Sequence, residues 1–214
     1  NLYAASVGDE KLECLTGVGA SGSMMYREEY DRARELLERC LKLSRKLGLQ
    51  EIEIEALDFL RHWHEMHNED RKKGFEIQLI LLKERLDVCR RIGAKPGVAD
   101  CCYKLFSYHI MGDLDLQGVG NSTLVRNYWE ESIENYEEVG DFEGLLRCHW
   151  QGFACFDEVR VTYQEQWKMY SEFIEDCIAH NVPSVEHHCR RSLIECALRE
   201  GELSVANAQP KKLE

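Results

Sequence analysis

A four-fold internal repeat constrains the fold of this 214-residue chain more than any other feature of its sequence. Short similar segments begin at Lys46, Arg91, Glu138 and Ala179, so that successive copies are offset by 45, 47 and 41 residues. The first three end in glycine and the fourth in asparagine, and both residues tolerate the left-handed backbone found at helix ends. A repeat of this length indicates an array of similar supersecondary units.

Two apolar stripes run through every copy of the repeat. Upstream of the glycine, large apolar residues align four positions apart: Leu37, Leu82, Trp129 and Tyr170, then Leu41, Leu86, Ile133 and Ile174. Downstream, a second stripe follows i, i+4, i+8 and i+11, and its second member is small: Ala56, Cys101, Cys148 and Cys189. Spacings of three and four residues place each stripe on one face of a helix. Each repeat is therefore predicted to be a pair of antiparallel helices.

The predicted fold class is an all-α solenoid of antiparallel helix pairs, with about eight helices. The expected helices span 25–47, 51–67, 71–92, 97–111, 122–139, 142–157, 161–180 and 184–201. They form one helical repeat domain over residues 25–202. The stretch 1–24, rich in glycine and serine, is expected to be an irregular N-terminal segment or cap, and 203–214 a flexible tail.

Glycine-containing turns give the chain a resemblance to a known family. Arg91 to Ala99 contains two glycines and is followed by Gly112-Asp113, and Val139 to Gly144 repeats the same signature. These segments resemble the leucine-glycine-aspartate turn and closing glycine-aspartate of the longer-repeat tetratricopeptide (TPR) proteins. The resemblance covers roughly residues 26–202 and departs from the standard 34-residue period. It implies a right-handed α-solenoid whose first helices line a concave, protein-binding surface.

Charge and hydropathy argue against two kinds of partner. The chain carries 39 acidic and 27 basic side chains, and its formal net charge of -12 opposes binding to phosphate backbones. No apolar run is long enough to span a membrane, and residues 1–8 lack the pattern of a signal peptide. We expect no nucleic-acid partner, no membrane partner and a cytoplasmic location. The sequence is compatible with a part of a larger chain or complex.

Ten cysteines and a histidine cluster raise the alternatives of a disulfide framework or a metal site. Most cysteines occupy apolar positions of the helical stripes, so we expect them to be reduced and expect no cofactor. Cys102 lies off the stripe and is the expected exposed thiol. Near Glu65, only His64 and His67 have the spacing of a shared helix face, whereas His62 does not. This cluster is therefore expected to be a solvated helix end and not a zinc site.

A row of rings and hydrogen-bond donors beside the second stripe is the candidate binding surface. Its members are Arg61, His64, Phe106, His109, His149, Phe153, Phe156 and Arg190. In a TPR architecture this row faces the concave surface, where the rings would anchor an apolar segment and the arginines would receive its acidic groups. The alternative is that these residues only contact neighbouring helices.

No set of residues in the sequence has the spacing of a catalytic site. The glycines between Gly17 and Gly22 lack the lysine and hydroxyl residue of a phosphate-binding loop, and no cysteine–histidine pair has an orienting third group. We therefore expect a non-enzymatic protein–protein interaction or scaffold module that binds a peptide or helix of a partner. The alternative is a regulatory or substrate-recruiting domain of a larger enzyme.

Overall fold

The chain forms helices throughout the part that its computed structural model describes, residues 9–67, 70–112, 123–153, 162–199 and 201. The nine helices in these ranges are α2 (Glu10–Tyr26), α3 (Tyr30–Leu47), α4 (Gln50–His67), α5 (Arg71–Ile92), α6 (Lys95–Gly112), α7 (Thr123–Val139), α8 (Phe142–Gly152), α9 (Tyr163–Ala179) and α10 (Pro183–Arg199). The predicted all-α class is confirmed.

Left-handed residues end the helices where the repeat pattern predicts them. Gly48, Gly93 and Gly140 follow α3, α5 and α7 with φ angles of 68°, 70° and 72°. Asn181, at the equivalent place after α9, has a φ of 54°. Because these residues reverse the chain within one or two positions, each of these helices is followed at once by the next helix along the chain.

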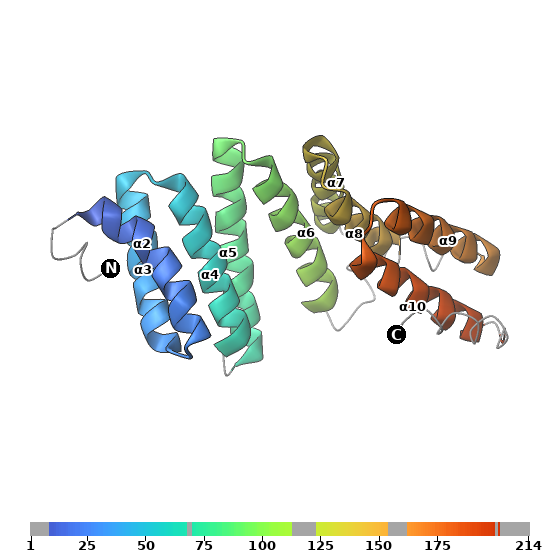
Figure 1. Cartoon of the computed structure of the whole chain (residues 1–214), viewed down its shortest axis with the longest axis horizontal. Coiled ribbons are helices and arrows are strands. Elements are labelled where there is room, and N and C mark those ends of the chain that lie inside the picture. The colour runs from blue at the N-terminus through green and yellow to red at the C-terminus, as the bar shows by residue number, and fades with distance from the viewer. Residues whose placement is uncertain (1–8, 68–69, 113–122, 154–161, 200, 202–214) are drawn as a thin grey trace. The chain divides into compact units, whose positions relative to one another are not determined.

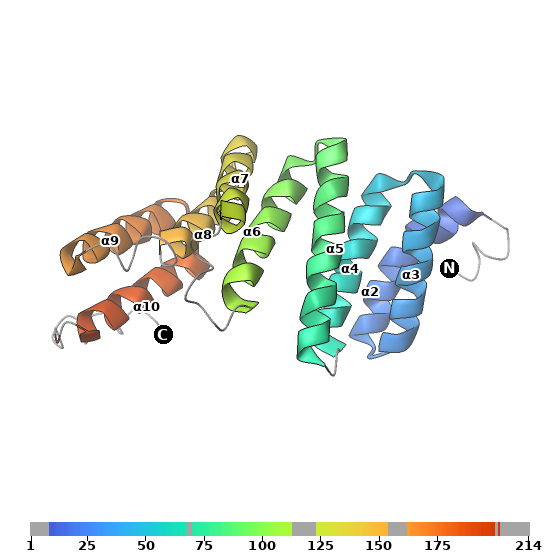
Figure 2. The ribbon, with the colours of Figure 1, turned by 180° about the vertical axis from the view of Figure 1, so that it is seen from behind.

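Two compact units divide the chain, Asn1–Tyr108 and His109–Glu214. In the first unit α2, α3, α4 and α5 run side by side, each packed against the next (Figures 1 and 2). In the second, α7 packs against α8, α8 against α9, and α9 against α10. The first helices of successive pairs also contact each other, α2 with α4 and α8 with α10, as expected for a helical repeat.

The N-terminal segment differs from the sequence-based expectation, because residues 10–24 are helical and not irregular. Asp9 caps α2 by accepting a hydrogen bond from the backbone N–H of Leu12 at 2.9 Å. The helix then packs against α3 through small residues, and a Cβ atom added at Gly17 would lie under 3.0 Å from Cys40 Sγ. Glycine therefore permits a close approach of the two helices. Helix α2 is the first helix of the pair that α3 completes.

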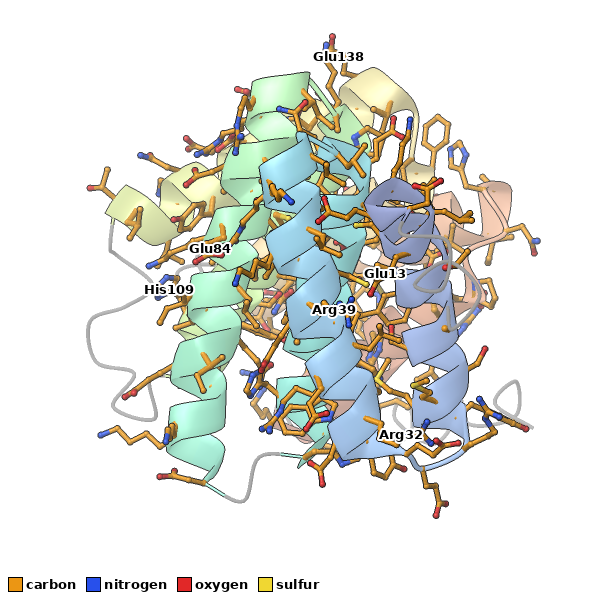
Figure 3. The ribbon with its side chains drawn as sticks, turned by 90° about the vertical axis from the view of Figure 1, so that its left-hand side faces the viewer. Glu13, Arg32, Arg39, Glu84, His109 and Glu138 are labelled. Atoms are coloured by element: carbon orange, nitrogen blue, oxygen red, sulfur yellow. The ribbon has the colours of Figure 1, made fainter. Side chains whose placement is uncertain are left out.

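An ion pair between a buried carboxylate and an exposed guanidinium also joins α2 to α3. Glu13 is only 5% exposed, and Arg39 Nε lies 2.7 Å from its Oε1. A second guanidinium nitrogen donates to the other carboxylate oxygen at 3.0 Å. Figure 3 shows the two side chains facing each other between the helices. The bidentate contact offsets the cost of taking the Glu13 carboxylate out of water.

Two further sequence-based boundaries fall partly outside the described residues. Helix α8 ends at Gly152, whereas the expected helix ran to residue 157; residues 154–161 are not among those described. The expected tail, 203–214, is likewise outside them. Helix α9 begins at a capping box in which Thr162 and Glu165 bond each other's backbone N–H groups. This cap fixes the start of α9 two residues after the expected one.

Candidate functional site

The aromatic members of the predicted row are core residues in this structure. Phe106 on α6 is 0% exposed and Phe153, directly after α8, is 5% exposed. The Phe153 ring packs edge-to-face on Tyr170 of α9, with 5.3 Å between ring centroids, and contacts Phe173 as well. The expectation that these rings line an open surface therefore does not match their burial. Phe156 lies outside the described residues, and partner binding by the row stays a prediction.

Arg61 is held inside the first unit by polar partners on two helices. Its guanidinium contacts Asp58 at 3.2 Å and Glu65 at 3.0 Å, both on α4, and donates to the Tyr108 hydroxyl on α6 at 3.0 Å. The Tyr108 hydroxyl in turn donates to Gln78 on α5. With all these contacts made and its side chain 9% exposed, Arg61 tethers helices and is not open to a partner's acidic group.

Asp58 also belongs to a charge network across α4, α5 and α6. Arg85 Nη1 lies 3.4 Å from Asp58 and 2.5 Å from Asp100, and Lys104 Nζ lies 2.9 Å from Asp100. Burial acts to raise the pKa of Asp58, but Arg85, Lys104 and Arg61 outweigh it, so that the pKa is below its ordinary value. Asp58 therefore stays ionised, and the network ties three helices together.

Histidines of the predicted row are partly buried. His64 packs edge-to-face on Trp63, with ring centroids 4.9 Å apart, and His109 stacks on Tyr128 at 6.1 Å. Burial lowers the pKa of His64 and of His149, which favours their neutral forms. These imidazoles fit a structural role better than that of exposed cationic contacts.

Arg190 is the last member of the row. On α10, it contacts Glu186 Oε1 at 2.7 Å one turn earlier on the same helix, and it is 9% exposed. Its charge is balanced within the second unit.

The structure instead contains a pocket of about 370 Å³ between α2, the start of α3 and the last turns of α4. Its walls are aromatic rings, imidazoles, two methionines and a glycine: Gly22, Met25, Tyr26, Tyr30, Phe59, His62, Trp63, Met66 and His67. We call this the α2–α4 pocket. All of its lining residues belong to the first unit.

The α2–α4 pocket combines a side chain held by contacts with side chains that are exposed to solvent. Trp63 is held by a hydrogen bond from Nε1 to the Tyr30 carbonyl at 3.0 Å and by the Arg34 guanidinium 4.9 Å from its ring centroid. Tyr26 is 91% exposed and Met66 is 63% exposed. An indole held by contacts and two exposed apolar side chains together offer a surface that suits an incoming apolar side chain.

A second hollow continues from this pocket over the outer face of α2. It is lined by Gly19, Gly22, Ser23, Tyr26 and Arg27, and so shares Gly22 and Tyr26 with the α2–α4 pocket. A Cβ atom added at Gly19 would meet nothing within 4 Å. The small residues leave room for a backbone segment to lie along α2 beside the pocket.

Sequence reasoning missed this site because it did not recognise α2. Without that helix, Gly22 belongs to an irregular segment and Tyr26 to the start of the expected helix 25–47, so Phe59 and His62 have no neighbouring helix to face. The predicted row takes Arg61 and His64 from α4, whereas the pocket takes residues one to three positions away. Since each residue turns a helix by about 100°, a shift of one or two positions points a side chain in another direction from the helix. The usable signal was the aromatic and methionine content between Met24 and Tyr30.

The cysteines of the described part are buried and form no disulfide with one another. This includes Cys102, which is 0% exposed, so the expectation of an exposed thiol there is wrong. Helix α6 buries a wide face that includes both Cys101 and Cys102, whereas a single stripe predicted only one. Within the described residues, no three histidine, cysteine, aspartate or glutamate side chains are grouped as a metal site requires.

Comparisons with known proteins do not assign the chain to a family. No protein-family model matches the chain, and no curated protein shows significant similarity to it. None of the described helices has the length and apolar character needed to cross a bilayer. The helical-repeat part of the TPR resemblance is supported by the successive helix pairs.

Proposed function

We propose that the chain is a TPR-like, non-enzymatic interaction or scaffold module that binds a peptide or helix of a partner protein. The observation that supports this proposal is the α2–α4 pocket, which opens between the first helices of two successive pairs. In helical-repeat proteins, such adjacent helices form extended surfaces that receive partner segments. The hollow along α2 lengthens this surface beyond a single side-chain pocket.

An apolar side chain of the partner is the occupant that fits the pocket best. Among the described residues that line it there is no aspartate, glutamate, lysine or arginine, so a charged group would lose hydration there without gaining a countercharge from them. Aromatic rings offer a large contact area, and methionine adapts to different shapes. The net charge of -12 favours a partner whose apolar anchor is flanked by basic residues.

Peptide selection on the full chain tests this proposal. Peptides selected from a random displayed library on the immobilised protein are titrated by fluorescence anisotropy against wild type, Tyr26→Ala and Met66→Ala. Both side chains are mostly exposed, so their loss should leave the fold intact. As buried anchors of the complex, each should cost about 1–3 kcal/mol, a loss of about 5- to 150-fold in affinity.

Ile80→Ala is the matched control. Ile80 on α5 is 57% exposed, comparable with Met66, and does not line the pocket. We expect unchanged affinity for this variant. The proposal fails if no peptide is enriched, and the pocket assignment fails if the selected peptides bind Tyr26→Ala and Met66→Ala as tightly as wild type. Loss of binding on substitution of His149 alone would instead favour the row predicted from the sequence.

A further inference from the structure

Exposed apolar side chains surround the place where α8 begins beside the end of α9. Phe142, the first residue of α8, stacks on His180, which directly follows α9, with ring centroids 4.1 Å apart and ring planes at 15°. Phe142 is 50% exposed; Val139, three positions before it, is 38% exposed, and Ile178, two positions before His180, is 56% exposed. We call these four residues the α8–α9 patch. All of them belong to the second unit.

Hydrogen bonds fix the backbone on both sides of the stacked rings. Glu143, the neighbour of Phe142, accepts a hydrogen bond from the Ser184 hydroxyl of α10 at 3.0 Å. The backbone N–H of His180 donates to the Asp176 carbonyl at 3.0 Å. Phe142 is therefore held against its neighbour while half of its surface stays open to solvent. A ring that is already held loses little conformational freedom when a partner covers it.

The other repeats show that the helix pair does not need an apolar side chain at this place. With the repeat offsets of 47 and 45 residues, Lys95 at the start of α6 and Gln50 at the start of α4 stand where Phe142 stands in α8. Both replacements are polar. The packing of α7 on α8 therefore does not explain why a phenylalanine is exposed here. Exposed apolar groups with a polar surround are typical of interaction surfaces.

The charges beside the patch are also reversed relative to the first two repeats. Basic residues occupy the last turns of the equivalent helices, Arg45 and Lys46 on α3 and Arg90 and Arg91 on α5. Such residues stabilise a helix end, where the carbonyl groups carry a partial negative charge. In α7 the same positions hold Glu137 and Glu138, and the last turns of α7 and α9 contain no basic residue. These carboxylates act against the helix dipole, so helix stability does not account for them.

Acidic residues predominate in both segments that form the patch. Residues 130–145 contain seven acidic residues and no lysine or arginine, and residues 172–186 contain four and again no lysine or arginine. Among them, Glu137, Asp141 and Asp176 are exposed. Basic groups of a partner would be attracted to this end of the second unit, whereas phosphates and carboxylates would be repelled. The charge of the surface thus selects a basic occupant.

We propose that the α8–α9 patch is a second docking surface, which binds a basic segment of a partner protein. An aromatic or branched aliphatic side chain of that segment packs on Phe142 and Ile178. Lysine or arginine residues on either side of this anchor pair with the carboxylates at the ends of α7 and α9. The α2–α4 pocket lies on the other unit, so this proposal does not depend on its occupancy.

A peptide array probed with the labelled full chain tests the proposal. Each peptide contains one phenylalanine, tryptophan, leucine or isoleucine in a glycine–serine background, with lysine or arginine on both sides of it. A second set carries glutamate in place of every basic residue. We expect binding to the basic set and not to the acidic set, and weaker binding as the salt concentration rises. Bound peptides are then titrated by fluorescence anisotropy.

Phe142→Ala tests the apolar anchor. Loss of this ring should lower the affinity for the basic peptides at least about fivefold. Leu198→Ala is the matched control, because Leu198 is also 50% exposed but lies in the last turn of α10, and it should leave the affinity unchanged. Tyr26→Ala, which alters the α2–α4 pocket, should leave it unchanged as well. Circular dichroism verifies that each variant is folded.

Glu137→Arg separates binding from stability. It places at the end of α7 the residue that Arg45 and Arg90 supply in the first two repeats, so the urea midpoint should stay the same or rise. The basic peptides should nevertheless associate more slowly, and the salt dependence of their binding should become weaker. A residue with a purely structural role would not give this combination.

Several outcomes overturn the proposal. It fails if no basic peptide binds, if the acidic set binds as tightly, or if folded Phe142→Ala and Glu137→Arg bind as wild type does. Loss of binding in Tyr26→Ala alone would assign these peptides to the α2–α4 pocket instead. A wild-type dimer in sedimentation experiments that Phe142→Ala converts to a monomer would assign the patch to self-association.

Discussion

Replacement of Gly17 by alanine tests the close packing of α2 on α3, the feature that the sequence did not predict. The added methyl group would lie under 3.0 Å from Cys40 Sγ, with Leu36 at 3.4 Å, inside a buried helix interface. Overpacking of this kind costs about 1–3 kcal/mol. Alanine also stabilises a helix interior by about 1 kcal/mol relative to glycine. The expected net change is a loss of about 0–2 kcal/mol.

Gly19→Ala is the matched control on the same helix. Nothing lies within 4 Å of a Cβ atom at this position, so the variant retains the helix-propensity gain of about 1 kcal/mol without the clash. Because the propensity gain is common to both variants, their difference isolates the clash. Gly17→Ala should be less stable than Gly19→Ala by about 1–3 kcal/mol.

Urea denaturation followed by far-UV circular dichroism measures this difference, and hydrogen exchange of peptides from α2 assigns it to the first unit. Combining Gly17→Ala with Cys40→Ala removes the sulfur that the new methyl group meets. The double variant should therefore recover about 0.5–3 kcal/mol relative to the sum of the single changes. Equal stability of Gly17→Ala and Gly19→Ala would show that α2 does not pack on α3 as described.

Three further predictions concern the core, the charge network and the thiols. Leu86→Ala should lower the free energy of unfolding by about 2–5 kcal/mol in a urea titration, because Leu86 is 2% exposed; a negligible loss would refute the repeat alignment. Asp58 has a pKa below its ordinary value, so its contribution is present above about pH 4 and is lost as the pH falls through the folded-state pKa. Asp58→Asn should therefore reduce the loss of folding stability between about pH 4 and the folded-state pKa of Asp58. An unchanged dependence of the unfolding free energy on pH would contradict the network. Native thiol titration should detect few reactive cysteines until urea is added, since the cysteines of the described part are buried thiols outside disulfides; rapid reaction of most thiols would contradict this.

The repeated helices were predictable because their packing depends on large apolar residues at regular spacing. Leu37, Leu82 and Tyr170 are all 0% exposed, as the first stripe requires. Helix α2 lacks such a stripe, because its buried face consists of Glu13, Cys14, Gly17, Val18 and Ser21. Small residues produce only a weak apolar pattern in the sequence, and their burial becomes apparent only when the neighbouring helix is known.

The candidate site was less predictable for a related reason. Burial of Phe106 and Phe153 and the polar partners of Arg61 depend on neighbours far away in the chain, such as Tyr108 for Arg61, 47 positions on. A helical pattern gives the face on which a residue lies. It does not tell which face meets another helix and which meets solvent, and the choice between the predicted row and the α2–α4 pocket depends on that distinction.

The order of helix contacts has a consequence for the kinetics of folding. Within each unit, the helices that pack closely are neighbours or next-but-one neighbours along the chain, such as α2 with α4 and α8 with α10. Loops closed by such contacts are short, and chains with a low average contact separation fold in microseconds to milliseconds. We therefore expect each unit to refold rapidly after dilution from urea, beginning at any helix pair that forms first.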